Sequence, residues 1–301
     1  MHDDPAATRA VPTSNGFQGA HGRLFYLCTG TIHLPGLLAG EPTLRAMRLP
    51  VRAGVFLDPE AGPVILDTGL ISLAHACRRT GKDSPAGAAL RAGLAGLGLT
   101  PENVGHVVLT GLTPGSLGGL ALFPRARLHM SGLHAEQVAR GAGPRDLLDG
   151  LPRAWLPDDA AARTTPAETA RAVPVMALSG EGYDLLGTGR LILAHLPAAL
   201  SAPGLPGASV VFARTDRGPV IHAGQAAWTA PQARQERNCR PVPGFCPARL
   251  RHAQDRRGQA ARILDGMRQG TARLILATDP ETHPEDLFTH GKSGDRGQER
   301  S

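Results

Sequence analysis

The sequence is short of aromatic residues, cysteine and lysine, and it has no long apolar run. Aromatic residues make up 4% of the 301 residues, so Leu, Val, Ile and Ala must fill most of a core. No run of about 18 apolar residues occurs, so no transmembrane helix is expected. The N-terminus, MHDDPAATRA, is acidic and polar and does not fit a secretory signal. We therefore expect a folded cytoplasmic protein.

The four cysteines do not suggest a disulfide framework. Cys28, Cys77, Cys239 and Cys246 are too few and too scattered for one, and a reduced compartment is the default for such a chain. Cys28 and Cys77 are interpreted as small core residues. The other two are too far apart for a zinc knuckle, so we interpret their segment as an arginine-rich loop with free thiols.

The basic charge comes almost entirely from arginine. The chain has 32 Lys and Arg against 26 Asp and Glu, a net charge of +6, and Lys82 and Lys292 are its only lysines. The spread of the arginines, with abundant Ala, Gly and Pro, indicates a compositional bias, so we do not expect nucleic-acid binding. The one cluster, Arg234–Arg262, is interpreted as a solvated helix and loop. Contact with an acidic partner or with nucleic acid is the alternative.

Strand and helix signals alternate in two similar halves, which favours one domain with two sheets flanked by helices. Residues 1–20 are expected to be flexible, residues 21–290 to form the domain, and residues 291–301 to be a disordered tail. Strands are predicted over residues 23–28, 51–57, 63–67, 106–110, 126–130, 173–178, 183–186, 190–194, 209–214, 219–223 and 273–276. Helices are predicted over residues 84–96, 116–123, 132–140, 247–267 and 284–288, with residues 141–172 irregular.

A turn of small residues, TGLTPGSLGG, follows the strand predicted over residues 106–110. It carries no acid, base, thiol or imidazole between Thr110 and Gly119. Phosphate binding by its backbone amides is one alternative, but the lysine of a P-loop and a G-x-G-x-x-G frame are both absent. Nucleophilic catalysis by Ser116 is another, and it would need a base, for which His222 is the best candidate.

Several segments, in chain order, carry a family resemblance. They are RLFYLCTGTIHLPG, LPVRAGVFLDPEAGPVILDTGL, LGLTPENVGHVVLT, GLALFPRARLHMSGLHAEQ, GASVVFARTDRGPVIHAGQAAWT and ARLILATDPE. Together they resemble the metallo-β-lactamase superfamily, most closely its branch of acyl-homoserine-lactone lactonases, with Asp67-Thr68-Gly69 as the aspartate turn. The resemblance covers residues from about 22 to 290. It implies an α/β fold, a four-layer α/β/β/α sandwich.

The same resemblance implies two zinc ions, held by a loop of the pattern T-H-x-H-x-D-H-x-G-G. Here that frame corresponds to Thr110–Gly119, and Thr110, Gly118 and Gly119 stand at scaffold positions. Neutral residues occupy all the positions of the metal ligands, namely Gly111, Thr113, Gly115, Ser116, Leu205, Gln225 and Thr278. Zinc takes imidazole, thiolate or carboxylate ligands, usually four. We therefore predict neither a catalytic residue nor a zinc ion or other cofactor.

Loss of the whole ligand set favours a catalytically inactive homologue, a pseudoenzyme. Unpaired carboxylates and clustered imidazoles would destabilise a cleft without a metal. Replacement of the whole ligand set by neutral residues removes this cost, so the cleft can fold without an ion. The hypothesis is a module for small-molecule binding or protein interaction, with the small molecule or partner unidentified and a homodimer compatible with the fold. The alternative is a metal-dependent lactone or ester hydrolase with an unusual or relocated metal site.

The predicted lining of the cleft is mostly neutral and suited to hydrogen bonding. It consists of Thr113, Ser116, His222, Gln225, Thr278 and Asp279. His222 is otherwise interpreted as a half-buried strand residue. His129 and His134 flank a strand-to-helix turn and are interpreted as surface or capping histidines rather than metal ligands.

Overall fold

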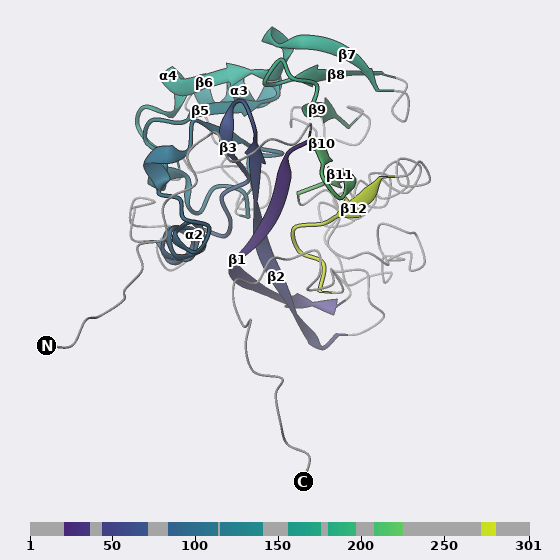
Figure 1. Cartoon of the computed structure of the whole chain (residues 1–301). Helices are drawn as coiled ribbons and strands as arrows, with labels where there is room; N and C mark the ends of the chain where they lie inside the picture. The colour runs from purple at the N-terminus through teal and green to yellow at the C-terminus, as the bar shows by residue number, and fades with distance from the viewer. Residues whose placement is uncertain are drawn as a thin grey trace, which may run out of the picture.

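Two six-stranded β-sheets form the centre of the structure (Figure 1). The structure is a computed structural model, and it describes residues 21–36, 44–71, 84–113, 115–140, 156–175, 180–196, 208–224 and 272–280. The expected flexible N-terminus, the tail, and the helices predicted over residues 247–267 and 284–288 therefore lie outside the described residues. Within them, no helix is long and apolar enough to cross a membrane.

The first sheet has its strands in chain order. They are β1 (Arg23–Pro35), β2 (Ala46–Asp58), β3 (Gly62–Leu66), β4 (His106–Val108), β5 (Arg127–Met130) and β6 (Thr164–Pro166). The first three pair antiparallel, and β3 to β6 pair parallel. Parallel strands end at the same edge of a sheet. The segments that follow β3, β4 and β5 therefore begin side by side, and the candidate functional site lies there.

The second sheet also keeps chain order. Its strands are β7 (Arg171–Val175), β8 (Gly180–Asp184), β9 (Leu191–His195), β10 (Ser209–Thr215), β11 (Gly218–His222) and β12 (Arg273–Ile275). All neighbours are antiparallel except β11 and β12. Alternate side chains of each strand point to opposite faces, so each sheet offers one face to the other sheet and one to the outside.

Apolar side chains fill the space between the sheets and the space under the helices. The inter-sheet core joins residues such as Phe56 and Leu66 of the first sheet to Leu193 and Val211 of the second. The outer face of the first sheet packs on α2 (Pro85–Gly96), α3 (Gly132–Arg140) and α4 (Ala160–Arg163). This arrangement of helices and two sheets confirms the predicted α/β sandwich.

Serine side chains cap two of the predicted helices, α2 and α3. The Ser84 hydroxyl accepts a hydrogen bond from Gly87 N at 3.0 Å and donates to Gly118 O, so it also ties α2 to the loop after β4. The Ser131 hydroxyl accepts from His134 N at 3.2 Å, where α3 begins. A serine at this position satisfies a backbone N–H that the first helical turn leaves without an intrahelical partner.

Three predictions about local structure and burial are wrong. Residues 116–123 form no α-helix but only a short 3-10 turn, η4 (Leu120–Leu122), because the preceding glycines bond to another segment. The segment 141–172, predicted to be irregular, contains α4, β6 and η6 (Ala167–Thr169) among its described residues. Cys28 is exposed at the bulge between β1 and β2, not a core residue. The other three cysteines lie outside the described residues.

Candidate functional site

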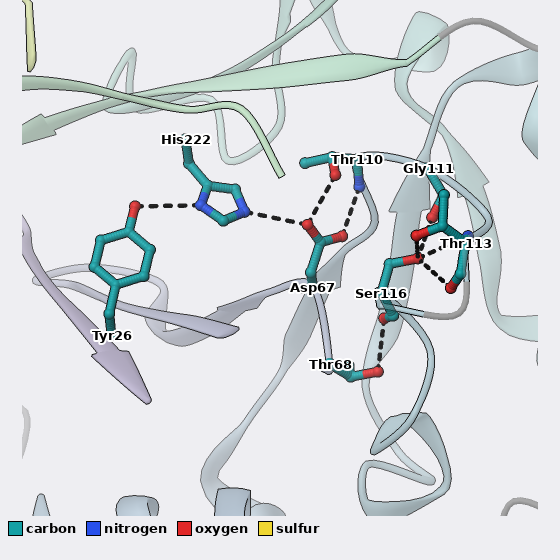
Figure 2. A network of polar contacts seen from close by, with 8 residues as sticks. All are labelled: Tyr26, Asp67, Thr68, Thr110, Gly111, Thr113, Ser116 and His222. Atoms are coloured by element: carbon teal, nitrogen blue, oxygen red, sulfur yellow. Dashed lines mark hydrogen bonds and ion pairs between the residues drawn. The ribbon is translucent and has the colours of Figure 1, made fainter. Parts of the chain in front are cut away.

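The loop after β4 is held closed by one hydroxyl group. Ser116 Oγ donates to the carbonyl oxygen of Gly111 and accepts from Thr113 N at 3.0 Å (Figure 2). Its oxygen also lies 3.0 Å from Thr113 O and 3.2 Å from Thr113 Oγ1. The side chain is buried, with 2% of its surface exposed. A hydroxyl has one proton to donate, and here that proton is used inside the loop.

The loop packs directly on the turn Asp67-Thr68-Gly69 after β3. Thr68 donates its N–H (2.7 Å) and its hydroxyl (2.8 Å) to Ser116 O. In return Gly118 N donates to Gly69 O and Gly119 N to Thr68 O. A Cβ at Gly118 would overlap the Leu70 carbonyl group, so only glycine allows this approach. The Gly-Gly pair is therefore needed for the fold, whether or not a metal binds.

The Asp67 carboxylate connects the loop to the second sheet. One oxygen, Oδ1, accepts from Thr110 N at 2.9 Å, and Oδ2 accepts from the Thr110 hydroxyl at 2.8 Å. Oδ2 also lies 3.2 Å from Nε2 of His222 at the end of β11, and Nδ1 of His222 lies 3.2 Å from the Tyr26 hydroxyl (Figure 2). Asp67 adopts a left-handed backbone conformation, with φ of 56°, which directs its side chain into this network.

The structure places the predicted cleft residues at different depths. Thr113 is partly exposed and Ser116 is buried. His222 and Thr278 have no exposed surface and Asp279 is 5% exposed, so His222 is fully buried rather than half-buried as predicted. Gln225 and Leu205 lie outside the described residues. The loop after β4, which carries these hydroxyl groups, therefore reaches the surface. The buried His222 contacts it indirectly, through Asp67.

The segment after β12 is fixed by a buried arginine of β2. Arg52 donates from Nη1 to Asp279 O at 2.6 Å, and its backbone N–H donates to Ala277 O at 2.9 Å. Burial lowers the pKa of the Arg52 guanidinium, although the Asp279 carboxylate acts in the opposite direction. These bonds hold Thr278 and Asp279 in place beside the network of Asp67.

A second polar cluster at this edge was not predicted. His195 of β9 lies with Nε2 2.8 Å from Glu168 Oε1 and with Nδ1 3.1 Å from Ser209 Oγ. Ser209 N donates to Thr110 O, which joins the cluster to the loop. The order serine, histidine, carboxylate is that of a catalytic triad. Ser209 has no exposed surface, however, so it does not contact a substrate in this conformation. No local spacing in the sequence joins these three residues.

His129 and His134 are not surface histidines. Both are 4% exposed, which corrects the prediction that they lie at the surface. His129 Nε2 lies 2.9 Å from His106 Nδ1, and His134 Nδ1 lies 2.8 Å from the Ser131 hydroxyl. The pKa of each imidazole is lowered to about 4, mainly by burial, and the neighbouring His106 and His195, respectively, contribute to this shift. Both side chains are therefore neutral at pH 7.

The described residues of this edge do not fit a zinc centre. Gly111 and Gly115 offer no side-chain donor, the Ser116 proton is used inside the loop, and both Asp67 oxygens bond to protein groups. In the part of the chain that the structure describes, no three His, Cys, Asp or Glu side chains gather as a metal-binding group.

Solved structures of hydrolases share this fold. A quorum-quenching N-acyl homoserine lactone lactonase is 16% identical, with a TM-score of 0.58 over 88% of this chain and 95% of that chain. AidC, a dizinc quorum-quenching lactonase, is 16% identical, with a TM-score of 0.57 over 87% and 88% of the two chains. AbOPH, a hydrolase of the β-lactamase superfamily, is 14% identical, with a TM-score of 0.52 over 88% and 89%. No family model and no curated protein matches the chain. The chain therefore has the fold of the metallo-β-lactamase superfamily, in the form found in these lactonases.

Proposed function

We propose that this protein binds a small molecule or a protein segment at the edge formed by the loop after β4, without a metal ion and without hydrolysing it. The observation that carries the proposal is the closed loop itself. Ser116 bonds to Gly111 and Thr113, at three positions where the resemblance implies metal ligands. The loop thus has internal hydrogen bonds where a zinc-binding loop would have bonds to the ion.

The electrostatics of the edge agree with this proposal. The Asp67 carboxylate accepts two hydrogen bonds from Thr110 and lies against His222, so this buried charge needs no cation. Thr113, which carries a hydroxyl group, is partly exposed. An edge that presents hydroxyl groups suits ligands that donate and accept hydrogen bonds, and among its described residues we find no set that would hold a metal ion to lower the pKa of a bound water.

The second candidate is a metal-dependent hydrolase with a relocated metal site. The fold neighbours favour it, because they are lactonases and other hydrolases that cover most of this chain. Such a site needs at least three protein ligands. The described imidazole–carboxylate pairs at this edge, His222 with Asp67 and His195 with Glu168, supply two each. A relocated site therefore has to recruit a further ligand from outside the described residues.

One experiment separates the two candidates. The full chain is purified with added zinc, its bound metal is measured by elemental analysis, and the same sample is assayed against a panel of lactones and esters. We expect less than about 0.1 zinc per chain and no turnover above the buffer rate. A zinc content near one or two per chain, with turnover that a chelator abolishes, would overturn the first candidate and establish the second.

Binding without chemistry is tested separately, with the uncleaved lactones of the same panel. We expect at least one of them to raise the melting temperature of the wild-type chain and to be recovered intact. The matched variant is Thr113→Val, which keeps the shape of the side chain but removes its hydroxyl group. The same thermal shift in the wild type and in this variant would show that the loop is not the binding surface.

A further inference from the structure

A cavity of about 290 Å³ lies away from the loop after β4. Its lining comes from the start of β1, from the turn between β10 and β11, and from the start of β12. His222, which touches Asp67, stands at the far end of β11. Because β12 runs parallel to β11, and β1 and β3 are both antiparallel to β2, the starts of these strands lie at the opposite edge of the sandwich.

The inner wall of this cavity is apolar. Tyr26, Val220 and Ile275 form a small buried cluster in which each is 3% or 4% exposed. The Tyr26 hydroxyl lies beside Nδ1 of His222, so the polar end of this residue already has a partner. A ligand that reaches the inner wall therefore meets aliphatic groups and an aromatic ring.

The mouth of the cavity is basic. Arg23, Arg217 and Arg273 line it and are exposed, and Asp216 is the one acidic residue among the described lining residues. The guanidinium group of Arg23 lies 5.0 Å from the centre of the Phe25 ring, a cation–π contact that orients it. Guanidinium groups bind carboxylate and phosphate groups with paired hydrogen bonds.

We propose that this cavity binds a small amphiphilic anion, with its apolar body against Tyr26, Val220 and Ile275 and its carboxylate or phosphate group among the three arginines. The volume is near the ~300 Å³ lower end of ligand pockets, which limits the body to a short chain or a single ring. The proposal does not rest on the proposed function, although Tyr26 also contacts His222 of the network beside the loop after β4.

Calorimetric titration of the full chain with three eight-carbon probes tests the proposal. Octanoate and octyl phosphate share the body and differ in the anionic group, whereas octylamine has the same body with a positive charge. We expect both anions to bind at one site, at least tenfold more tightly than octylamine, and to weaken as salt is raised. Tighter binding of octanoate or of octyl phosphate identifies the preferred head group. Equal affinity for all three probes would overturn the proposal.

Variants then locate the site. Arg23→Gln, Arg217→Gln and Arg273→Gln are each expected to weaken the preferred anion about fivefold, and the triple variant at least fiftyfold. The matched control is Arg214→Gln, which removes an exposed arginine of β10 that does not line the cavity. We expect it to bind within twofold of the wild type. A loss in Arg214→Gln as large as in the three lining variants would show that only the net charge matters and would refute the site.

Discussion

Arg190 holds Asp58 across the two sheets, with its Nε 2.9 Å from Oδ2 and its Nη2 3.2 Å from Oδ1. Asp58 ends β2 in the first sheet, and Arg190 directly precedes β9 in the second. Burial alone would raise the pKa of Asp58, but hydrogen bonds from Arg190, Ala61 N and Glu60 N lower it. The same guanidinium group also reaches Glu60 at 2.6 Å. This pair is the main charged connection between the sheets among the described residues.

Removing the arginine of this ion pair should destabilise the folded protein. Arg190→Met leaves a carboxylate with no exposed surface and without its cation, so we expect the free energy of unfolding to fall by about 3 kcal/mol. Arg190→Lys should cost less, because it keeps the charge but loses the forked geometry. The control Arg140→Met removes an exposed pair with Glu136 and should change stability by less than about 0.5 kcal/mol. Urea unfolding measures the stability of all three variants. Similar losses in Arg190→Met and Arg140→Met would contradict a stabilising role of the Arg190–Asp58 pair.

Stability should fall steeply on the acid side of neutrality. His129 and His134 have pKa values of about 4 in the folded protein, compared with about 6.5 in an unfolded chain. Between these values the unfolded state binds more protons, so lowering the pH from 6.5 towards 4 favours unfolding. Each histidine should contribute about 2 kcal/mol of lost stability by pH 5. Urea unfolding at pH 7, 6 and 5 measures the slope.

The variant His134→Gln serves as the test of that assignment. It removes one of the two buried titrating groups, and its side chain can still bond to the Ser131 hydroxyl. The loss of stability between pH 7 and pH 5 should be about 2 kcal/mol smaller than in the wild type. An unchanged pH dependence in this variant would mean that His134 does not titrate with the lowered pKa.

The Ser116 hydroxyl should matter for stability rather than for turnover. Ser116→Ala leaves Thr113 N and Gly111 O without this partner in a buried loop, so we expect the free energy of unfolding to fall by about 1 to 3 kcal/mol. Thr169→Ala is the control, because its hydroxyl bonds to Pro166 O at an exposed position. It should cost less than about 0.5 kcal/mol. Thermal unfolding of both variants decides whether the loop depends on this bond.

Restoring only the loop ligands should not restore a metal site. The variant with Gly111→His, Thr113→His, Gly115→Asp and Ser116→His provides donors in one loop, while the positions of Leu205, Gln225 and Thr278 still lack theirs. We expect less than about 0.2 zinc per chain by elemental analysis and a lower melting temperature, because the Ser116 hydroxyl is also lost. Stoichiometric zinc in this variant would reveal further ligands already present in the chain.

The sequence was informative about order and weak about long-range contacts. The chain order of its strands and the caps Ser84 and Ser131 were predictable, because local patterns carry them. The hydrogen bond between His222 and Asp67 was not predictable, because the two residues are 155 positions apart in the sequence. Each of them could equally have bonded to another buried polar group. The cluster of Glu168, His195 and Ser209 was not predictable for the same reason.

Local errors have physical causes as well. Residues 116–123 have helical leucine spacing, but Gly118 N and Gly119 N donate to Gly69 O and Thr68 O, and these long-range bonds replace a helical turn. The strand β6 is only three residues long and ends in proline, so it lacks the alternation that marks a strand. Its position is set by pairing with β5 rather than by its own sequence.

The Ser116 hydroxyl has a consequence for how the protein matures in a cell. Under the proposed function, a nascent chain that closes this loop with its own side chain would complete the edge of the sandwich without an ion from its surroundings. Its native abundance should therefore be the same in zinc-starved and in zinc-replete cells.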